Sequence, residues 1–232
     1  MIANLGQHVL ALSGEIDGLL RHGNHRRADE LRGKKALLVF LVCGGFYGAI
    51  MATFAFSAER LPLVAYGMLK VPTLFGFTMI LAIPGFYVLS NLRGVGSDFK
   101  EVFSLLLDYQ LLIAITLAAL APITLLVNLS ASSDAYQAVQ LWNTFTFFIA
   151  AVTAQRKFSS QSKALVYKDS RHRLLLHGWT ALYAFIGIQM AWTLRPFIGS
   201  PGQRIGFLRE GKLENAYVKL FEIFSELLGS IF

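Results

Sequence analysis

The sequence predicts an all-α, polytopic transmembrane helical bundle of about five spans, with an amphipathic helix at each terminus. Its 232 residues are 55% hydrophobic and 15% charged, whereas a soluble domain carries charge at about 25% of its positions. Five long apolar stretches alternate with short polar connections, and a stretch of about 20 such residues crosses a hydrocarbon core. Lys and Arg gather beside these stretches, as the orientation of a membrane protein requires.

Residues 1–34 are expected to form a cytoplasmic leader that is amphipathic and then basic. It is not a signal peptide, because Glu15 and Asp17 interrupt the region that would be uniformly apolar. Apolar residues recur at helical spacing at Val9, Leu12, Ile16, Leu19 and Leu20. Such a helix lies on the membrane or the bundle, or docks as an ordinary cytosolic helix on the protein's own loops, and the pattern leaves these open.

The transmembrane domain is expected at residues 35–194. The five spans are placed at about residues 36–57, 71–89, 104–127, 138–154 and 174–194. In the first, Gly44 and Gly48 stand in a G-x-x-x-G frame, where small residues let a neighbouring helix approach closely. The neighbour is a helix of the same chain or of a second copy.

Two prolines inside spans, Pro84 and Pro122, are expected to kink their helices, because proline removes a backbone hydrogen bond and clashes with the preceding turn. Broken spanning helices mark binding sites in some transporters. Proline kinks also occur without any substrate, so this pattern alone does not indicate transport.

Four polar residues are candidates for function at or within the spans. Asp108 lies one turn inside its apolar stretch, where it either serves a pathway, ion pair or proton relay or sits among the headgroups. Gln189 and His177 are the polar members of the last span; a histidine there ligates a metal or pigment, or is simply its polar edge. Arg195 follows the last span, where it pairs with an acidic partner or lipid phosphate, or reaches the headgroups as a helix terminator.

Residues 195–232 are expected to lie outside the cell as a loop followed by an amphipathic C-terminal helix. The loop is indicated by glycine and proline between Arg195 and Gly206. From Leu213 onward apolar residues repeat every three or four positions, while Lys219, Glu222 and Glu226 exclude a sixth span.

The distribution of Lys and Arg gives the orientation. With five spans, 14 of the 21 basic residues fall on the side of the N-terminus, two (Arg60 and Lys70) fall in the opposing short loops, and five in the C-terminal segment. The positive-inside rule therefore places the N-terminus in the cytoplasm and the C-terminus outside, in the periplasm if the membrane is a bacterial inner membrane.

The sequence offers little chemistry for an enzyme. Familiar motifs for phosphate binding, metalloproteases, redox dithiols and serine hydrolases are absent from it. We therefore expect no catalytic residue, cofactor or metal. Nucleic-acid binding is not expected either, because the basic residues flank apolar segments instead of forming one face.

A short C-terminal pattern carries a resemblance. The residues Arg195-Pro196-Phe197-Ile198-Gly199-Ser200-Pro201, followed by Asn215-Ala216-Tyr217-Val218, resemble the tail of a group of uncharacterised bacterial five-span membrane proteins. The layout is similar to that of Yip1-type membrane proteins. The resemblance implies a bacterial integral membrane protein without a catalytic centre.

Three hypotheses for function follow. The first is a non-catalytic subunit or scaffold of a larger membrane assembly, whose partners are membrane lipids and other membrane protein subunits. The second is a small-solute or ion transporter or channel, for which Asp108, Gln189, Pro84 and Pro122 are the motivating residues. The third is a lipid-modifying membrane enzyme, motivated by Arg195 and scattered acids and histidines.

Overall fold

The computed structural model describes residues 30–195, 197–199, 206–208 and 217–218, and the regular secondary structure of these residues is helical, without a strand. The prediction of an all-α fold is confirmed. The leader at 1–29 lies outside the described residues, and of the predicted C-terminal helix only Tyr217 and Val218 are described.

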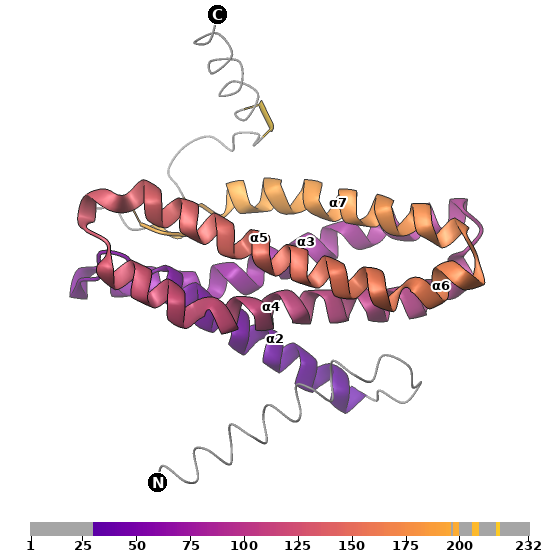
Figure 1. Ribbon diagram of the computed structural model, residues 1–232, viewed down its shortest axis with the longest axis horizontal. Helices are drawn as coiled ribbons and strands as arrows, with labels where there is room; N and C mark the ends of the chain where they lie inside the picture. The colour runs from indigo at the N-terminus through magenta and orange to yellow at the C-terminus, as the bar shows by residue number, and fades with distance from the viewer. Residues whose placement is uncertain (1–29, 196, 200–205, 209–216, 219–232) are drawn as a thin grey trace, which may run out of the picture.

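Five long helices build the bundle. They are α2 (Glu30–Met51), α3 (Leu61–Leu92), α4 (Phe99–Ser130), α5 (Tyr136–Gln161) and α7 (Arg171–Thr193). Short helical turns join them, namely η1 (Ala58–Arg60), η2 (Gly96–Asp98), η3 (Ser133–Ala135) and α6 (Lys163–Lys168). In Figure 1 the chain runs back and forth along the long axis in α3, α4, α5 and α7, while α2 crosses obliquely.

Four helical segments in the described part of the chain are long and apolar enough to cross a membrane: Gly33–Met51, Leu61–Leu92, Gly96–Ser130 and Arg171–Thr193. Between 22% and 39% of each apolar window is buried inside the protein, and large apolar side chains cover much of the outer surface. A soluble protein rarely exposes such continuous apolar surface. By the same measure α5 does not qualify, so the fifth span is not established by length and composition.

The helices are longer at several ends than the predicted spans. The predicted connection at residues 59–70 is mostly helix, because α3 starts at Leu61 with a proline in its first turn and runs through Lys70. A proline at that position is compatible with a helix start, since its missing N–H would have no partner there.

The first predicted span is longer than its helix, because α2 ends at Met51 instead of near residue 57. Arg60 donates hydrogen bonds to the carbonyls of Phe54 and Ala55, which holds the chain in a turn there.

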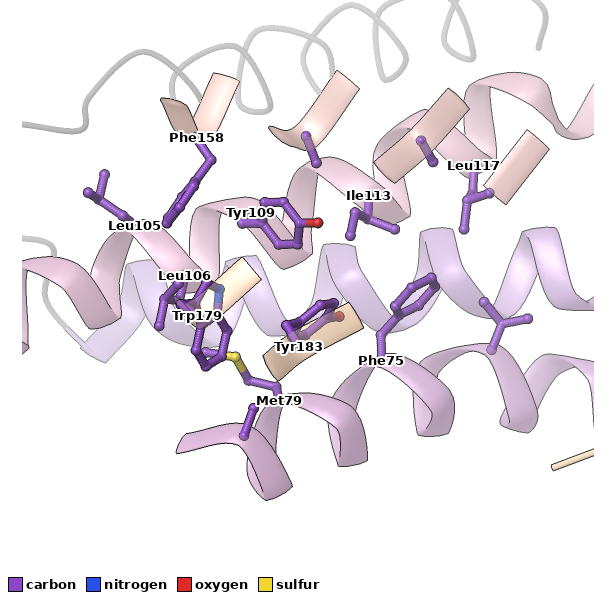
Figure 2. Packing of buried hydrophobic residues seen from close by; sticks show 14 of the residues in the cluster. Phe75, Met79, Leu105, Leu106, Tyr109, Ile113, Leu117, Phe158, Trp179 and Tyr183 are labelled. Atoms are coloured by element: carbon purple, nitrogen blue, oxygen red, sulfur yellow. The ribbon is translucent and has the colours of Figure 1, made fainter. Parts of the chain in front are cut away.

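All five long helices contribute buried side chains to the interior, and those at its centre come from α3, α4, α5 and α7. Figure 2 shows these side chains pointing toward one another from all four helices. Tyr109 of α4 packs edge-on against Phe158 of α5 and Tyr183 of α7, with ring centroids 5.7 and 5.6 Å apart. Trp179 of α7, 2% exposed, packs against Phe86 of α3. Aromatic rings therefore occupy the centre of the bundle, where a water-filled path would have to run.

Candidate functional site

The residues singled out from the sequence do not meet at one place. Asp108 is half-buried in the third turn of α4, near the end of the bundle where α7 begins. Gln189 is half-buried in the last turns of α7, toward the opposite end. His177 is exposed, and its Nδ1 lies 2.6 Å from the carbonyl oxygen of Arg173. Among the described residues, no group of three His, Cys, Asp or Glu side chains is placed to hold a metal ion.

Arg195 lies directly after α7 and is half-buried. Its Nε donates a hydrogen bond to the carbonyl of Trp192, 3.0 Å away, and its guanidinium carbon lies 3.1 Å from the centre of the Trp192 ring. Stacking of a guanidinium on an indole is a favourable cation–π arrangement. These two contacts hold the side chain of Arg195 against the end of its own helix.

The G-x-x-x-G residues of α2 face α3. A Cβ placed on Gly48 would lie 2.0 Å from the carbonyl oxygen of Gly67, and a Cβ on Gly67 would lie 2.3 Å from that of Gly48. The two backbones therefore touch, which only paired glycines permit. One turn away, Gly44 packs on the ring of Pro72.

Both predicted kink residues lie within unbroken helices. Pro84 is inside α3 and Pro122 inside α4, and both are exposed on the outer surface. Each leaves the carbonyl four residues earlier without its helical N–H partner. Neither proline divides its helix into two segments, the arrangement that marks transporter sites.

A polar contact without a signal in the sequence joins α2, α4 and α5. The hydroxyl of Tyr47, a fully buried residue of α2, donates a hydrogen bond to Oδ1 of Asn143, 3.0 Å away, and also contacts the hydroxyl of Thr146. Beside it, Nε1 of Trp142 donates to Oγ1 of Thr124 on α4, 3.2 Å away. Polar groups in a membrane interior are satisfied in this way because no water is available to them.

A second buried contact joins α3, α4 and α7. Gln110 donates from Nε2 to the carbonyl of Phe75, 3.1 Å away, and accepts a hydrogen bond from the hydroxyl of Tyr183, 3.0 Å away. Gln110 is 6% exposed and Tyr183 8%. Gln110 uses both ends of its amide, which ties three helices together through one side chain.

Lys70 is the most unusual side chain in the described structure, since it is fully buried within α3. Its Nζ lies 5.9 Å from the ring centre of Phe197 and 5.3 Å from that of Phe207. Both rings come from the segment after α7, and Phe207 also packs edge-on against Tyr66 of α3. From the sequence Lys70 is expected in an exterior loop, because a charged residue ordinarily ends a span.

An ionic cluster ties the connections at the end of the bundle where α7 begins. Asp98 of η2 contacts Nζ of Lys168, 2.6 Å away, and Nε2 of the buried His172, 3.3 Å away. Next to it, Arg171 binds Asp169 and also donates to the carbonyl of Arg93, 3.1 Å away. Hydrogen bonds from Arg171 lower the pKa of Asp169 to about 2. The cluster links the α3–α4 connection to the α6–α7 connection.

At the opposite end, Arg60 performs the equivalent role. It binds the α2–α3 turn as described above and also donates to the carbonyl of Gly199, after α7. Tyr136, at the start of α5, donates to the neighbouring carbonyl of Ile198, 3.3 Å away. Polar side chains at both ends therefore connect the helical turns, and those inside join helices.

Compared with known proteins, the chain matches no protein-family model, no curated protein and no solved structure.

Proposed function

We propose that the chain is an integral membrane protein with five spans, α5 being the fifth. The support is topological: α4 ends at one end of the bundle and α7 begins at the other, so the chain between them returns along the full length (Figure 1). The hydropathy of α5 is lowered by polar residues such as Asn143 and Thr146, which are buried and hydrogen-bonded. Their polarity is therefore no obstacle to crossing lipid.

The N-terminus is cytoplasmic and the end of α7 is exterior, in a bacterial inner membrane. With Lys70 inside α3, the short connections at the exterior end retain only Arg60 as a basic residue. The other end carries Arg93, Lys100 and the six basic residues between 156 and 173. Such an asymmetry is the basis of the positive-inside rule.

Single cysteines test this topology, with the one native cysteine removed as Cys43→Ala. Asp134→Cys is expected to react with an impermeant maleimide in intact cells, and Lys100→Cys and Lys163→Cys only after permeabilisation. Labelling of Lys163→Cys but not of Lys100→Cys in intact cells would show that α5 does not cross, and labelling of both would show the reverse orientation.

The function we assign is that of a non-catalytic subunit or scaffold of a larger membrane assembly. The observation that supports this function is that only part of α2 packs closely on the bundle. From Gly33 to Cys43 no residue of α2 is buried, whereas Gly44, Gly45, Tyr47 and Gly48 onward pack on the bundle. Leu38 and Val42 are 61% and 60% exposed, and Figure 1 shows this half of the helix leaning away from the others. The angle leaves room for a transmembrane helix of another subunit.

The packed centre of the bundle agrees with a structural role. Rings of Tyr109, Phe158, Trp179 and Tyr183 fill it, and the sequence candidates Asp108 and Gln189 lie toward opposite ends. Transport through the bundle would need polar groups arranged along one path.

Site-specific photocrosslinking in native membranes tests the assignment. A photoreactive residue at Leu38 or Val42 is expected to capture one and the same membrane protein, identified by mass spectrometry. The control is Ile80 of α3, which is equally exposed at 60%. Mild-detergent extraction and size analysis should recover that protein with the chain in one large complex. Capture of a second copy alone, or equal capture from Ile80, would contradict the assignment.

A further inference from the structure

The outward face of α5 changes character along its length. Four residues spaced four, three and four apart form an apolar stripe on this face, namely Leu141, Phe145, Phe148 and Val152. The first three are 71%, 52% and 63% exposed. The stripe is about 16 Å long at the helical rise of about 1.5 Å per residue, close to half of a hydrocarbon core of about 30 Å.

The same face continues into a depression at the end of α5, which is lined by Val152 together with polar and basic residues. Its volume is about 360 Å³, it is shallow, and it is lined by Val152, Gln155, Arg156, Ser159, Ser160 and Lys163. Five of these residues lie on the last turns of α5 and recur at helical spacing, and Lys163 follows them as the first residue of α6, so together they form one strip at this end of the helix. Val152 belongs to both parts, and the apolar stripe therefore leads directly into the depression.

The depression carries a net positive charge. Between residues 135 and 168 the sequence contains no Asp or Glu but four basic residues, of which Lys168 is paired with Asp98. Arg156 and Lys163 are exposed and form no ion pair with any other described residue. Two cations and two serine hydroxyls at one point match the charge and hydrogen-bonding capacity of a phosphate group.

The carbonyl end of α5 opposes an anion at this point, because the last turn of a helix carries partial negative charge. Ser162 reduces this effect. The backbone N–H of Ser162 donates a hydrogen bond to the carbonyl of Phe158, 2.9 Å away. The hydroxyl of Ser162 donates to the backbone carbonyl of Ser159, 3.3 Å away. The full charges of Arg156 and Lys163 then dominate the local field.

We propose that this face of α5 is a binding site for one anionic glycerophospholipid. The phosphate lies between Arg156 and Lys163, Ser159 and Ser160 donate hydrogen bonds to its oxygens, and an acyl chain lies along the apolar stripe. The depression is at the cytoplasmic edge of the membrane, where anionic headgroups attract basic residues. The site rests on the proposed crossing of α5 but not on the scaffold role.

Native mass spectrometry of the purified full chain measures the site directly. Phosphatidylglycerol and phosphatidylcholine with identical acyl chains are titrated in turn, and the affinities compared. The wild-type chain is expected to bind phosphatidylglycerol more tightly. A basic residue near an anionic headgroup contributes about fivefold in affinity, so Arg156→Gln/Lys163→Gln should weaken phosphatidylglycerol binding by roughly 25-fold.

The matched control is Lys100→Gln/Arg173→Gln, which removes two exposed cations from the same end of the bundle outside the depression. It should stay within about twofold of wild type. A second variant, Arg156→Lys/Lys163→Arg, keeps the charge and should retain the preference, which separates loss of the site from misfolding.

Three results would overturn the proposal. They are equal losses in the site and control variants, no preference for phosphatidylglycerol in the wild type, and displacement of the lipid by millimolar inorganic phosphate, which would indicate an anion site without an acyl chain. Crosslinking from Leu38 in the site variant reports separately on the scaffold role, and labelling of Lys163→Cys reports on the crossing of α5.

Discussion

The contact between Gly48 and Gly67 allows a quantitative test of how α2 is held. In Gly48→Ala the new Cβ would lie 2.0 Å from the Gly67 carbonyl oxygen, whereas ordinary contacts begin at about 3.4 Å. The obstacle is backbone, so no side-chain rotation relieves it, and the helices must separate by more than an ångström. Overpacking of this kind costs about 1–3 kcal/mol.

Separation of the helices also strains the adjacent Tyr47 contact with Asn143 and Thr146. A hydrogen bond between membrane helices contributes about 0.6 kcal/mol on average, so the total loss for Gly48→Ala is roughly 2–4 kcal/mol. Gly67→Ala is expected to behave alike, because its Cβ would lie 2.3 Å from the Gly48 carbonyl oxygen.

The assay is SDS-induced unfolding in mixed micelles, followed by tryptophan fluorescence, with Trp179 as the buried reporter. Gly76→Ala is the matched control on α3, since nothing lies within 4 Å of a Cβ placed there. An alanine in a helix is more stable than a glycine by about 0.5–1 kcal/mol, so this variant should gain stability. A Gly48→Ala protein as stable as wild type, or a destabilised Gly76→Ala protein, would refute the reasoning.

The other predictions concern the polar contacts. Tyr47→Phe should lose about 0.6–1.7 kcal/mol of stability, while Tyr167→Phe, at a site 96% exposed, should lose nothing measurable in the same unfolding assay. A double-mutant cycle of Gln110→Ala and Tyr183→Phe should give a coupling energy of about 0.5–1.5 kcal/mol; strict additivity would show that the 3.0 Å contact does not stabilise the protein. Asp98→Asn should raise protease cleavage in the α6–α7 connection, because the carboxylate binds Lys168 and contacts His172 there; unchanged cleavage would show that the cluster does not hold the connection.

The all-helical fold was predictable because its signal is local. A run of apolar residues long enough to span a membrane is visible in the sequence without knowledge of the partners. The ends of the spans were less predictable, and Lys70 shows why. A lysine ordinarily ends an apolar stretch, but here two phenylalanine rings from the segment after α7 cover its ammonium group. Sequence proximity gives no sign of such a contact.

The polar contacts inside the bundle were unpredictable for the same reason. Tyr47 is separated by 96 residues from Asn143, and Tyr183 by 73 from Gln110. None of these residues breaks the apolar pattern strongly enough to be noticed alone. Asp108, Gln189, His177 and Arg195 stood out because each is conspicuous within its own segment. A polar residue within an apolar segment can therefore be recognised in the sequence, whereas a hydrogen bond between two helices cannot.

The attachment of α2 connects these contacts to the proposed role. Helices in lipid gain no hydrophobic energy from association, so close packing and hydrogen bonds must hold them. Three close contacts attach the second half of α2: the glycine contact at Gly48, the Tyr47 hydroxyl, and Asn128 of α4, whose Nδ2 donates to the carbonyl of Ile50, 2.8 Å away. In the first half Phe40 packs against the core, whereas Leu37 and Leu38 are 56% and 61% exposed, and we propose that these exposed side chains contact a helix of another subunit.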